Sequence, residues 1–278
     1  MFLPRKEEVR IMKKLAVLIS VITFFVLVQI SAKTISGEEK SRVFSLPETA
    51  QKISQNVYYL GRSKDTNGRS VEGYAFVHKK GANAKPVKPP KGGGPSCYGY
   101  LANGAKWKSL ENYIVDTTNS RGLSGAFVSS NLSYDIDKWE SATTQNIIGN
   151  EVSGVVDGAD TVSPDDKNEV YFADVTDSNA IAVTIVWGYF GGPPQWRELV
   201  EWDQVYDDVD YDWSSSGELD KMDFENVATH ELGHTFGMDD IYELACSDVT
   251  MYGYADEGET KKQTLEQPDI DGVKKLYD

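Results

Sequence analysis

The sequence predicts an α+β fold, because strand-like and helix-like patterns both occur along its second half. Three runs, at residues 169–175, 181–187 and 197–206, have the length and composition of strands. Residues 124–146 carry apolar side chains every three to four positions, as an amphipathic helix does, and residues 224–236 lie between a helix-start and a helix-stop residue. Apolar residues make up 40% of the 278 residues, which is enough to bury a core.

Residues 1–32 are predicted to be a secretory signal peptide. A pair of lysines precedes an apolar run over residues 15–30, and the small residue Ala32 follows it. A basic start, an apolar middle and a small exit residue are typical of a segment removed on export. The alternative is an uncleaved anchor, although the run is shorter than the roughly 20 residues that span a bilayer. We expect a secreted protein with no stable membrane insertion after cleavage.

Residues 33–80 are predicted to form a small separate unit. Val57–Leu60 and Tyr74–Val77 are strand-like, and an Asn-Gly pair between them is typical of a tight turn. Residues 81–96, rich in Pro, Gly and Lys, are predicted to be a linker. The unit is interpreted either as an inhibitory propeptide or as a flexible stalk or adhesion module.

Residues 97–278 form the predicted main domain. Its first helix is expected at Ser124–Asn146, and a second at Phe224–Phe236, with Asp223 as its N-cap and Gly237 as its stop. The expected strands are Trp107–Val115, Glu169–Val175, Ile181–Trp187 and Arg197–Tyr206. A short closing helix is expected at Pro268–Tyr277.

Charge is distributed unevenly between the two parts of the chain. Residues 1–96 carry 17 Lys/Arg and 7 Asp/Glu, whereas residues 97–278 carry 11 and 36. The acidic main domain argues against nucleic acid as a partner, because phosphates would be repelled. Most of its carboxylates are interpreted as a solvated surface, and the acidic balance leaves room for calcium, which prefers carboxylate oxygens.

The most informative motif is the His-Glu-x-x-His pattern that begins at His230. On a helix, His230 and His234 lie on one face, so both imidazoles can reach one zinc ion. Glu231 is one step round the helix, where it can contact a catalytic water rather than the metal. A catalytic zinc takes three protein ligands and keeps one position open. The sequence therefore predicts a zinc site with Glu231 as the general base.

The third ligand is predicted to be a carboxylate, because the chain has three histidines and the remaining one, His78, lies in the N-terminal unit. Gly237 can turn the chain back towards the metal, and Asp240 follows three residues later. Asp239 is the neighbouring alternative. A distant glutamate, Glu257 or Glu259, would leave the Gly-x-x-Asp spacing unexplained.

The motif and a methionine 11 residues after Asp240 resemble the metzincin peptidases. Met251 in Val-Thr-Met-Tyr-Gly-Tyr is similar to the metzincin Met-turn, a tight turn below the zinc. The chain's end, Leu265–Tyr277, is similar to the closing helix of the matrixins, and Ala105–Trp107 to their start. The likeness is strong over 230–277 and faint elsewhere in 97–278.

The matrixin resemblance implies a twisted mixed five-stranded sheet with two long helices, a C-terminal helix, and zinc in a cleft. In that family an edge strand binds substrate through its backbone. The matching cleft residues are Ile181, Ala182, Val183 and Thr184 on that strand, and Tyr252, Gly253 and Tyr254 in the S1′ wall. The chain lacks the histidines for the family's second, structural zinc. The family's calcium sites are loosely suggested by Asp203, Asp207, Asp208, Asp210 and Asp212.

The two cysteines are predicted to form a disulfide, since the exported chain would enter an oxidising compartment. A Cys97–Cys246 bridge would join the start of the domain to the loop after Asp240. The alternative comes from matrixin zymogens, whose propeptide thiolate blocks zinc, and Cys97 faintly resembles that switch.

We therefore expect a secreted zinc endopeptidase that acts on peptides or proteins as a monomer. The competing interpretation is a non-catalytic surface or binding protein with a peptidase-like fold.

Overall fold

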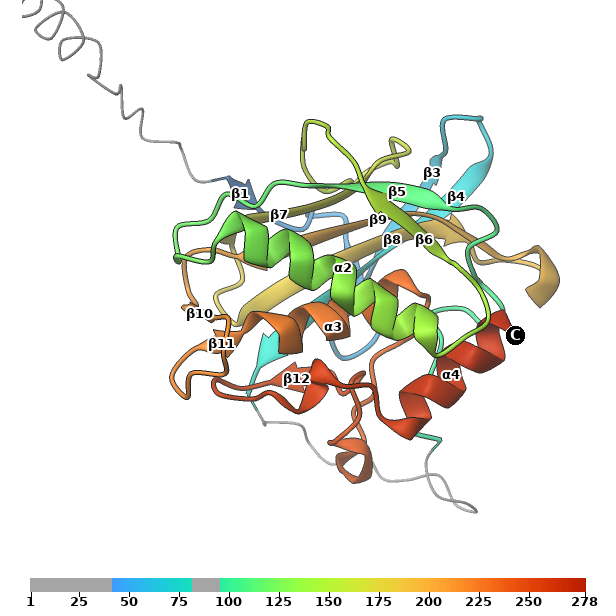
Figure 1. Cartoon of the computed structure of the whole chain (residues 1–278). Helices are drawn as coiled ribbons and strands as arrows, with labels where there is room; N and C mark the ends of the chain where they lie inside the picture. Colours follow the sequence, from blue (N-terminus) through green and yellow to red (C-terminus); the bar gives the residue numbers. More distant parts are fainter. Residues whose placement is uncertain (1–41, 82–95) are drawn as a thin grey trace, which may run out of the picture. The chain divides into compact units, whose positions relative to one another are not determined.

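The computed structural model describes residues 42–81 and 96–278, which belong to one compact unit, 41–278. The predicted signal peptide, and most of the predicted linker, lie outside the described residues. Over the ranges that the structure describes, no helix has both the length and the apolar character needed to cross a bilayer. The cartoon in Figure 1 shows how helices and sheet are layered.

The sheet contains the five strands that the family resemblance implied. They run in the order β6 (Ile148–Glu151), β5 (Glu111–Val115), β7 (Asn168–Val175), β9 (Glu198–Asp207) and β8 (Ala180–Tyr189). Pairs β5–β6, β5–β7 and β7–β9 are parallel, and β8–β9 is antiparallel. The α+β fold with a mixed sheet is confirmed.

The N-terminal segment extends this sheet beyond β8, so the prediction of a separate unit is wrong over residues 42–80. Strand β4 (Ser70–Lys80) pairs antiparallel with β8, β3 (Val57–Lys64) pairs with β4, and β2 (Gln51–Lys52) pairs with β3. Turn formation at Gly68, where φ is +78°, was predicted. The sequence did not indicate that this hairpin would pair with the edge of β8.

Two hydrophobic cores lie on opposite faces of the sheet. Helices α2 (Gly125–Ser141) and α3 (Phe224–Thr235) cover one face (Figure 1), where Trp139 and Trp202 are fully buried, and α4 (Gln267–Tyr277) adds Val273. The other core joins β7, β8 and β9 to residues of the N-terminal hairpin. The hairpin therefore shares the main hydrophobic interior.

The remaining short elements are β1 (Val43–Phe44), β10 (Trp213–Ser214), β11 (Met222–Asp223), β12 (Tyr254–Ala255), η1 (Pro194–Trp196), η2 (Leu244–Cys246) and η3 (Lys261–Gln263).

Helix α3 begins and ends as its sequence predicts. The side chain of Asp223 accepts a hydrogen bond from the backbone N–H of Asn226 at 2.9 Å, which satisfies a free donor of the first turn. Gly237 follows the helix with φ of +93°, a conformation that glycine adopts without strain. This turn directs the chain back across the end of α3.

The predicted disulfide is confirmed. Cys97 and Cys246 are bonded and have a Cα–Cα distance of 5.3 Å. The bridge connects the start of the main domain with the loop after Asp240, so Cys97 is not a free thiol.

Candidate metal centre

Two imidazoles from α3 and one carboxylate from the turn after it meet at a single point. Asp240 Oδ1 lies 3.3 Å from His230 Nε2 and 3.5 Å from His234 Nε2. Zinc bonds of about 2.0–2.1 Å at tetrahedral angles put neighbouring ligand atoms about 3.3 Å apart. The spacing of the three atoms therefore suits one zinc ion.

Hydrogen bonds orient each ring so that its Nε2 lone pair faces this point. The Nδ1 atoms of His230 and His234 lie 2.7 Å and 3.0 Å from the carbonyl oxygens of Thr250 and Met238. A carbonyl can only accept, so each ring carries its proton on Nδ1. Burial lowers the pKa of His230 to about 3, which keeps the ring neutral as a ligand must be.

Two atoms at this point are buried and lack a hydrogen-bond partner, namely His230 Nε2 and Asp240 Oδ1. Buried polar atoms without partners are costly, and a cation among them would remove that cost. The second Asp240 oxygen accepts a hydrogen bond from the Tyr242 hydroxyl at 2.6 Å. Burial alone would raise the pKa of Asp240, but the rings and Tyr242 lower it. The residues fit a divalent metal.

Asp239, the neighbouring alternative for the third ligand, makes a local hydrogen bond. Its Oδ1 accepts the backbone N–H of Asp240 at 2.9 Å. Among the described residues, the group of potential ligands that holds both rings contains Asp240 rather than Asp239. Asp240, three residues after Gly237, is therefore the aspartate that lies beside the two rings.

Glu231 lies beside the ligands, completely buried. Its Oε2 accepts a hydrogen bond from the Thr184 hydroxyl at 2.5 Å, and its Oε1 has no hydrogen-bond partner. Burial raises the pKa of Glu231 to about 8, since an ionised carboxylate is costly away from water. Thr184 thus holds one oxygen of the Glu231 side chain in place.

The turn that carries Met251 lies beneath α3. Met251 is fully buried, and its sulfur lies so close to Gly233 that a Cβ there would be 2.1 Å away. The carboxylate of Asp269, on α4, accepts the backbone N–H groups of Thr250 and Met251 at 2.9 Å and 3.2 Å. Helix α4 therefore fixes the turn that supports the ligands.

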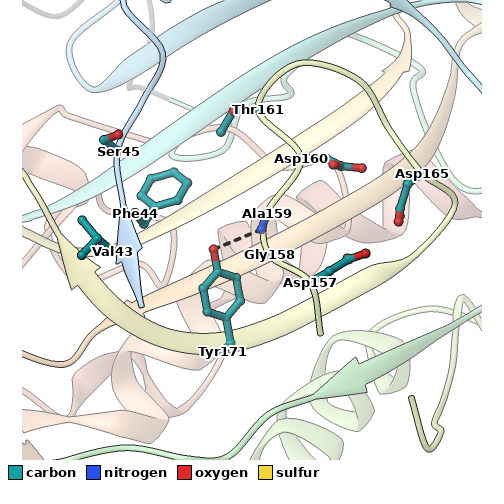
Figure 2. Close-up of a pocket in the computed structure, with 10 residues that line it drawn as sticks. All are labelled: Val43, Phe44, Ser45, Asp157, Gly158, Ala159, Asp160, Thr161, Asp165 and Tyr171. Carbon is teal, nitrogen blue, oxygen red and sulfur yellow. Dashed lines mark hydrogen bonds between the residues drawn. The ribbon is translucent and has the colours of Figure 1, made fainter. Parts of the chain in front are cut away.

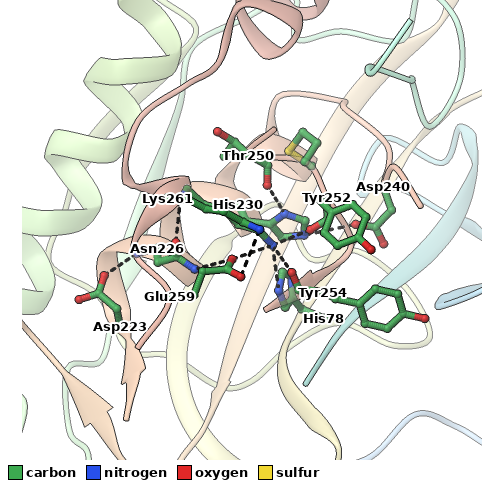
Figure 3. Close-up of polar contacts among 12 residues, drawn as sticks. His78, Asp223, Asn226, His230, Asp240, Thr250, Tyr252, Tyr254, Glu259 and Lys261 are labelled. Carbon is green, nitrogen blue, oxygen red and sulfur yellow. Dashed lines mark hydrogen bonds and ion pairs between the residues drawn. The ribbon is translucent and has the colours of Figure 1, made fainter. Parts of the chain in front are cut away.

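Two residues of β4 reach the centre, and sequence reasoning missed both. Phe76 stacks on the His234 ring with centroids 4.0 Å apart. His78 meets the His230 ring edge-on at 3.9 Å, as Figure 3 shows, and its Nδ1 lies 3.3 Å from Glu231 Oε1. His78 lies in the segment predicted to be a separate unit, although a chain with three histidines, two of them in the metal motif, makes the remaining one a candidate neighbour of the site.

Lys262 is a third unexpected neighbour, and the sequence carried no sign of it. Its side chain is fully buried, and Nζ donates to the carbonyls of Tyr252 and Tyr254 at 2.5 Å and 2.7 Å. The same atom lies 3.5 Å from His78 Nε2. Burial lowers the pKa of Lys262 to about 8.

The residues predicted to line an open substrate cleft instead flank β4. Ile181, Ala182, Val183 and Thr184 lie on β8 and are buried next to β4. On its other side β4 pairs with Tyr254, next to Tyr252 and Gly253. An open edge strand is therefore the wrong description of β8.

Among the described residues, the carboxylates suggested for calcium are not part of any group whose ligand atoms lie close enough to hold one metal ion. Asp203 accepts the backbone N–H groups of Asp160 and Glu169, and Asp208 accepts that of Ser120. Backbone donors thus contact the carboxylate oxygens of Asp203 and Asp208. A different acidic group consists of Asp160, Asp165 and Glu201. Asp160 and Asp165 line the pocket of Figure 2.

The comparisons with known proteins cover the C-terminal third of the chain. The family model described as matrixin matches residues 197–278. A relative, Metalloendoproteinase 1 of Glycine max, is 38% identical over 76 residues, which is 25% of this chain and 24% of that protein. The chain therefore matches about a quarter of the length of that relative.

Proposed function

We propose that this chain, which is a matrixin-like metzincin, is an exported zinc endopeptidase that hydrolyses peptide bonds in proteins. One observation carries the proposal. His230, His234 and Asp240 present three atoms at zinc-ligand spacing, with Glu231 beside them. Export is supported by the pattern of residues 1–32 and by the disulfide, which is typical of an oxidising compartment.

Zinc, when held by these three side chains, would act as a Lewis acid that polarises the scissile carbonyl and acidifies the attacking water. Glu231 Oε1 accepts the proton of that water, because Thr184 holds the other oxygen. The same carboxyl group then delivers the proton to the leaving amine.

Metal analysis joined to a proteolysis assay tests the proposal. We expect one zinc per purified chain, loss of zinc in Asp240→Ala, and cleavage of casein that a chelator abolishes and added zinc restores. Zinc binding without cleavage, under every condition that opens the site, would favour the competing interpretation of a binding protein with a peptidase-like fold.

A further inference from the structure

We propose that β4 is a built-in substrate mimic, a strand that occupies the peptide-binding channel of this domain and keeps the peptidase latent until it leaves. The inference rests on the proposed function and adds its regulation.

The backbone of β4 lies between the two predicted walls of the channel. On one side it pairs antiparallel with β8, from Glu72 opposite Gly188 to Lys79 opposite Ala180. On the other side its last two residues pair parallel with Tyr254–Ala255. Addition of an extended segment to a sheet edge is a general mode of peptide recognition. The strand thus uses the backbone groups that a peptide substrate would need.

The side chains of β4 are directed at the catalytic groups. Alternate residues of a strand point to one face, and Phe76 and His78 both face the metal centre. Phe76 covers the His234 ring, and His78 covers both the His230 ring and the free oxygen of Glu231. Val77, between them, points to the opposite face and joins the second core. The strand blocks the metal ligands and the base together.

The centre is closed to solvent while β4 is docked. His230 and Glu231 are 0% exposed, and His234 is 1% exposed. A peptide carbonyl must come within bonding distance of the metal, so hydrolysis requires this cover to move. Docking also holds His78 Nδ1 and Glu231 Oε1, both buried, 3.3 Å apart without the geometry of a hydrogen bond between them. Departure of β4 would return both atoms to water, which favours an exchangeable cover over a permanent one.

Gly73→Val in the full chain tests this inference. A Cβ at Gly73 would lie 2.7 Å from the Trp187 ring, so the larger side chain weakens docking without touching the metal centre. Gly191→Val, in open space after β8, is the matched control. We expect Gly73→Val to hydrolyse casein at least 10-fold faster than wild type and to show faster hydrogen exchange over residues 70–80. Its zinc content and melting curve report whether it has folded.

A synthetic peptide of residues 70–80 provides the second arm. We expect it to bind folded Gly73→Val competitively with substrate, and to lose at least 10-fold in affinity when Phe76 and His78 are both replaced by alanine. Wild type and Gly73→Val with equal, high activity would overturn the inhibitory strand and leave the proposed function standing. If neither form cleaved protein, the proposed function would fall, and peptide binding would still decide whether β4 occupies the channel.

A different observation carries a second site. The structure assigns a calcium-type cation site to Asp160, Asp165 and Glu201, each of which offers an oxygen within 4.8 Å of the others. Glu201 is 0% exposed, and its Oε1 has no hydrogen-bond partner. Asp160 Oδ2 is also buried and unpaired. Calcium binds several carboxylate oxygens at 2.3–2.6 Å, so it suits these atoms.

The surrounding loop holds the three carboxylates in place. Glu201 Oε2 accepts the backbone N–H groups of Asp165 and Asp166 at 2.7 Å and 2.5 Å, which leaves Oε1 for a ligand. The Lys167 ammonium contacts Asp165 and the nearby Asp157, so a cation must compete with it. Figure 2 shows Asp157, Asp160 and Asp165 around the pocket.

Terbium is a suitable probe, because the Trp187 indole donates a hydrogen bond to the Asp160 carbonyl at 2.7 Å. We expect indole-sensitised terbium emission that calcium displaces, and a rise in melting temperature with calcium. Glu201→Gln should lose both effects, whereas Asp212→Asn, an exposed carboxylate that pairs with Arg121, should keep both. Equal responses in wild type and Glu201→Gln would show that terbium binds elsewhere and remove the site.

Discussion

The sulfur of Met251 lies against the backbone of Gly233, in the space that the Cβ of any other residue at position 233 would need. Gly233 falls between the two histidines of α3, so this contact fixes the height of the helix above the turn that carries Met251. The ring of Trp139 closes the same space, 2.8 Å from that Cβ position. The glycine inside the His-Glu-x-x-His motif is therefore required by packing.

Gly233→Ala should destabilise the fold and shift the histidines. Overpacking of a buried site typically costs about 1–3 kcal/mol, and we expect a loss of that size. Chemical denaturation measures it, with Gly191→Ala as the control in open space. An unchanged free energy of unfolding and full zinc content would contradict the contact.

Glu231→Gln should keep zinc and lose hydrolysis. The residue does not bind the metal in the proposed arrangement, and removal of a general base typically lowers the rate by about 10²–10⁴. The variant is best made together with Gly73→Val, so that strand docking does not mask the result. Retained activity with one zinc bound would move the base to another residue.

Asp240→Ala should lower zinc affinity far more than Asp239→Ala. Loss of a residue that only orients a ligand typically costs about 10–100-fold in affinity, and loss of the ligand itself should exceed that. Tyr242→Phe, which removes the hydrogen bond to Asp240, should fall within the smaller range. Competition with a fluorescent zinc chelator measures all three. The reverse order for the two aspartates would assign the ligand to Asp239.

Replacement of both cysteines by serine should destabilise the domain. The bridge closes a separation of 149 residues, and the chain-entropy model gives up to about 4–5 kcal/mol for such a loop. Thermal unfolding of the variant and of reduced wild type should agree. A melting temperature equal to that of the oxidised protein would mean that the bridge adds nothing.

Asp135 should make stability depend on pH. Burial on α2 raises the pKa of Asp135 to about 7. The Lys138 ammonium lowers this pKa in part, and the Glu225 carboxylate raises it. Because the folded-state pKa exceeds the unfolded value of about 3.9, this stability is present below about pH 4 and is lost as pH rises to about 7. Asp135→Asn should flatten the dependence, and the exposed Asp137→Asn should leave it unchanged. Parallel curves for wild type and Asp135→Asn would contradict the assignment.

Local signals explain what the sequence could predict. Helix α3 was bounded correctly because Asp223 and Gly237 act on their own neighbours. The turn to Asp240 depends on the same few residues, so its place beside the rings followed from spacing. The disulfide could be predicted because the chain has two cysteines and the predicted export would take them to an oxidising compartment.

The pairing of β4 with β8 could not be predicted in this way. It joins residues more than 100 positions apart, and strand patterns do not specify which edge a strand will pair with. His78 and Lys262 were missed for the same reason, since each enters the centre through a distant part of the chain. The five-stranded sheet was implied by the family resemblance, and the added hairpin is where this chain departs from it.

Cys97 follows residues 82–95, whereas β4 precedes them. The disulfide therefore anchors residues 97–278 to themselves and leaves the main chain as the covalent connection to residues 42–81. A single scission between positions 81 and 97 would convert an intramolecular contact into an association between two polypeptides. Inhibition by β4 would then depend on the dissociation constant of the two polypeptides, and a nicked sample would gain specific activity on dilution.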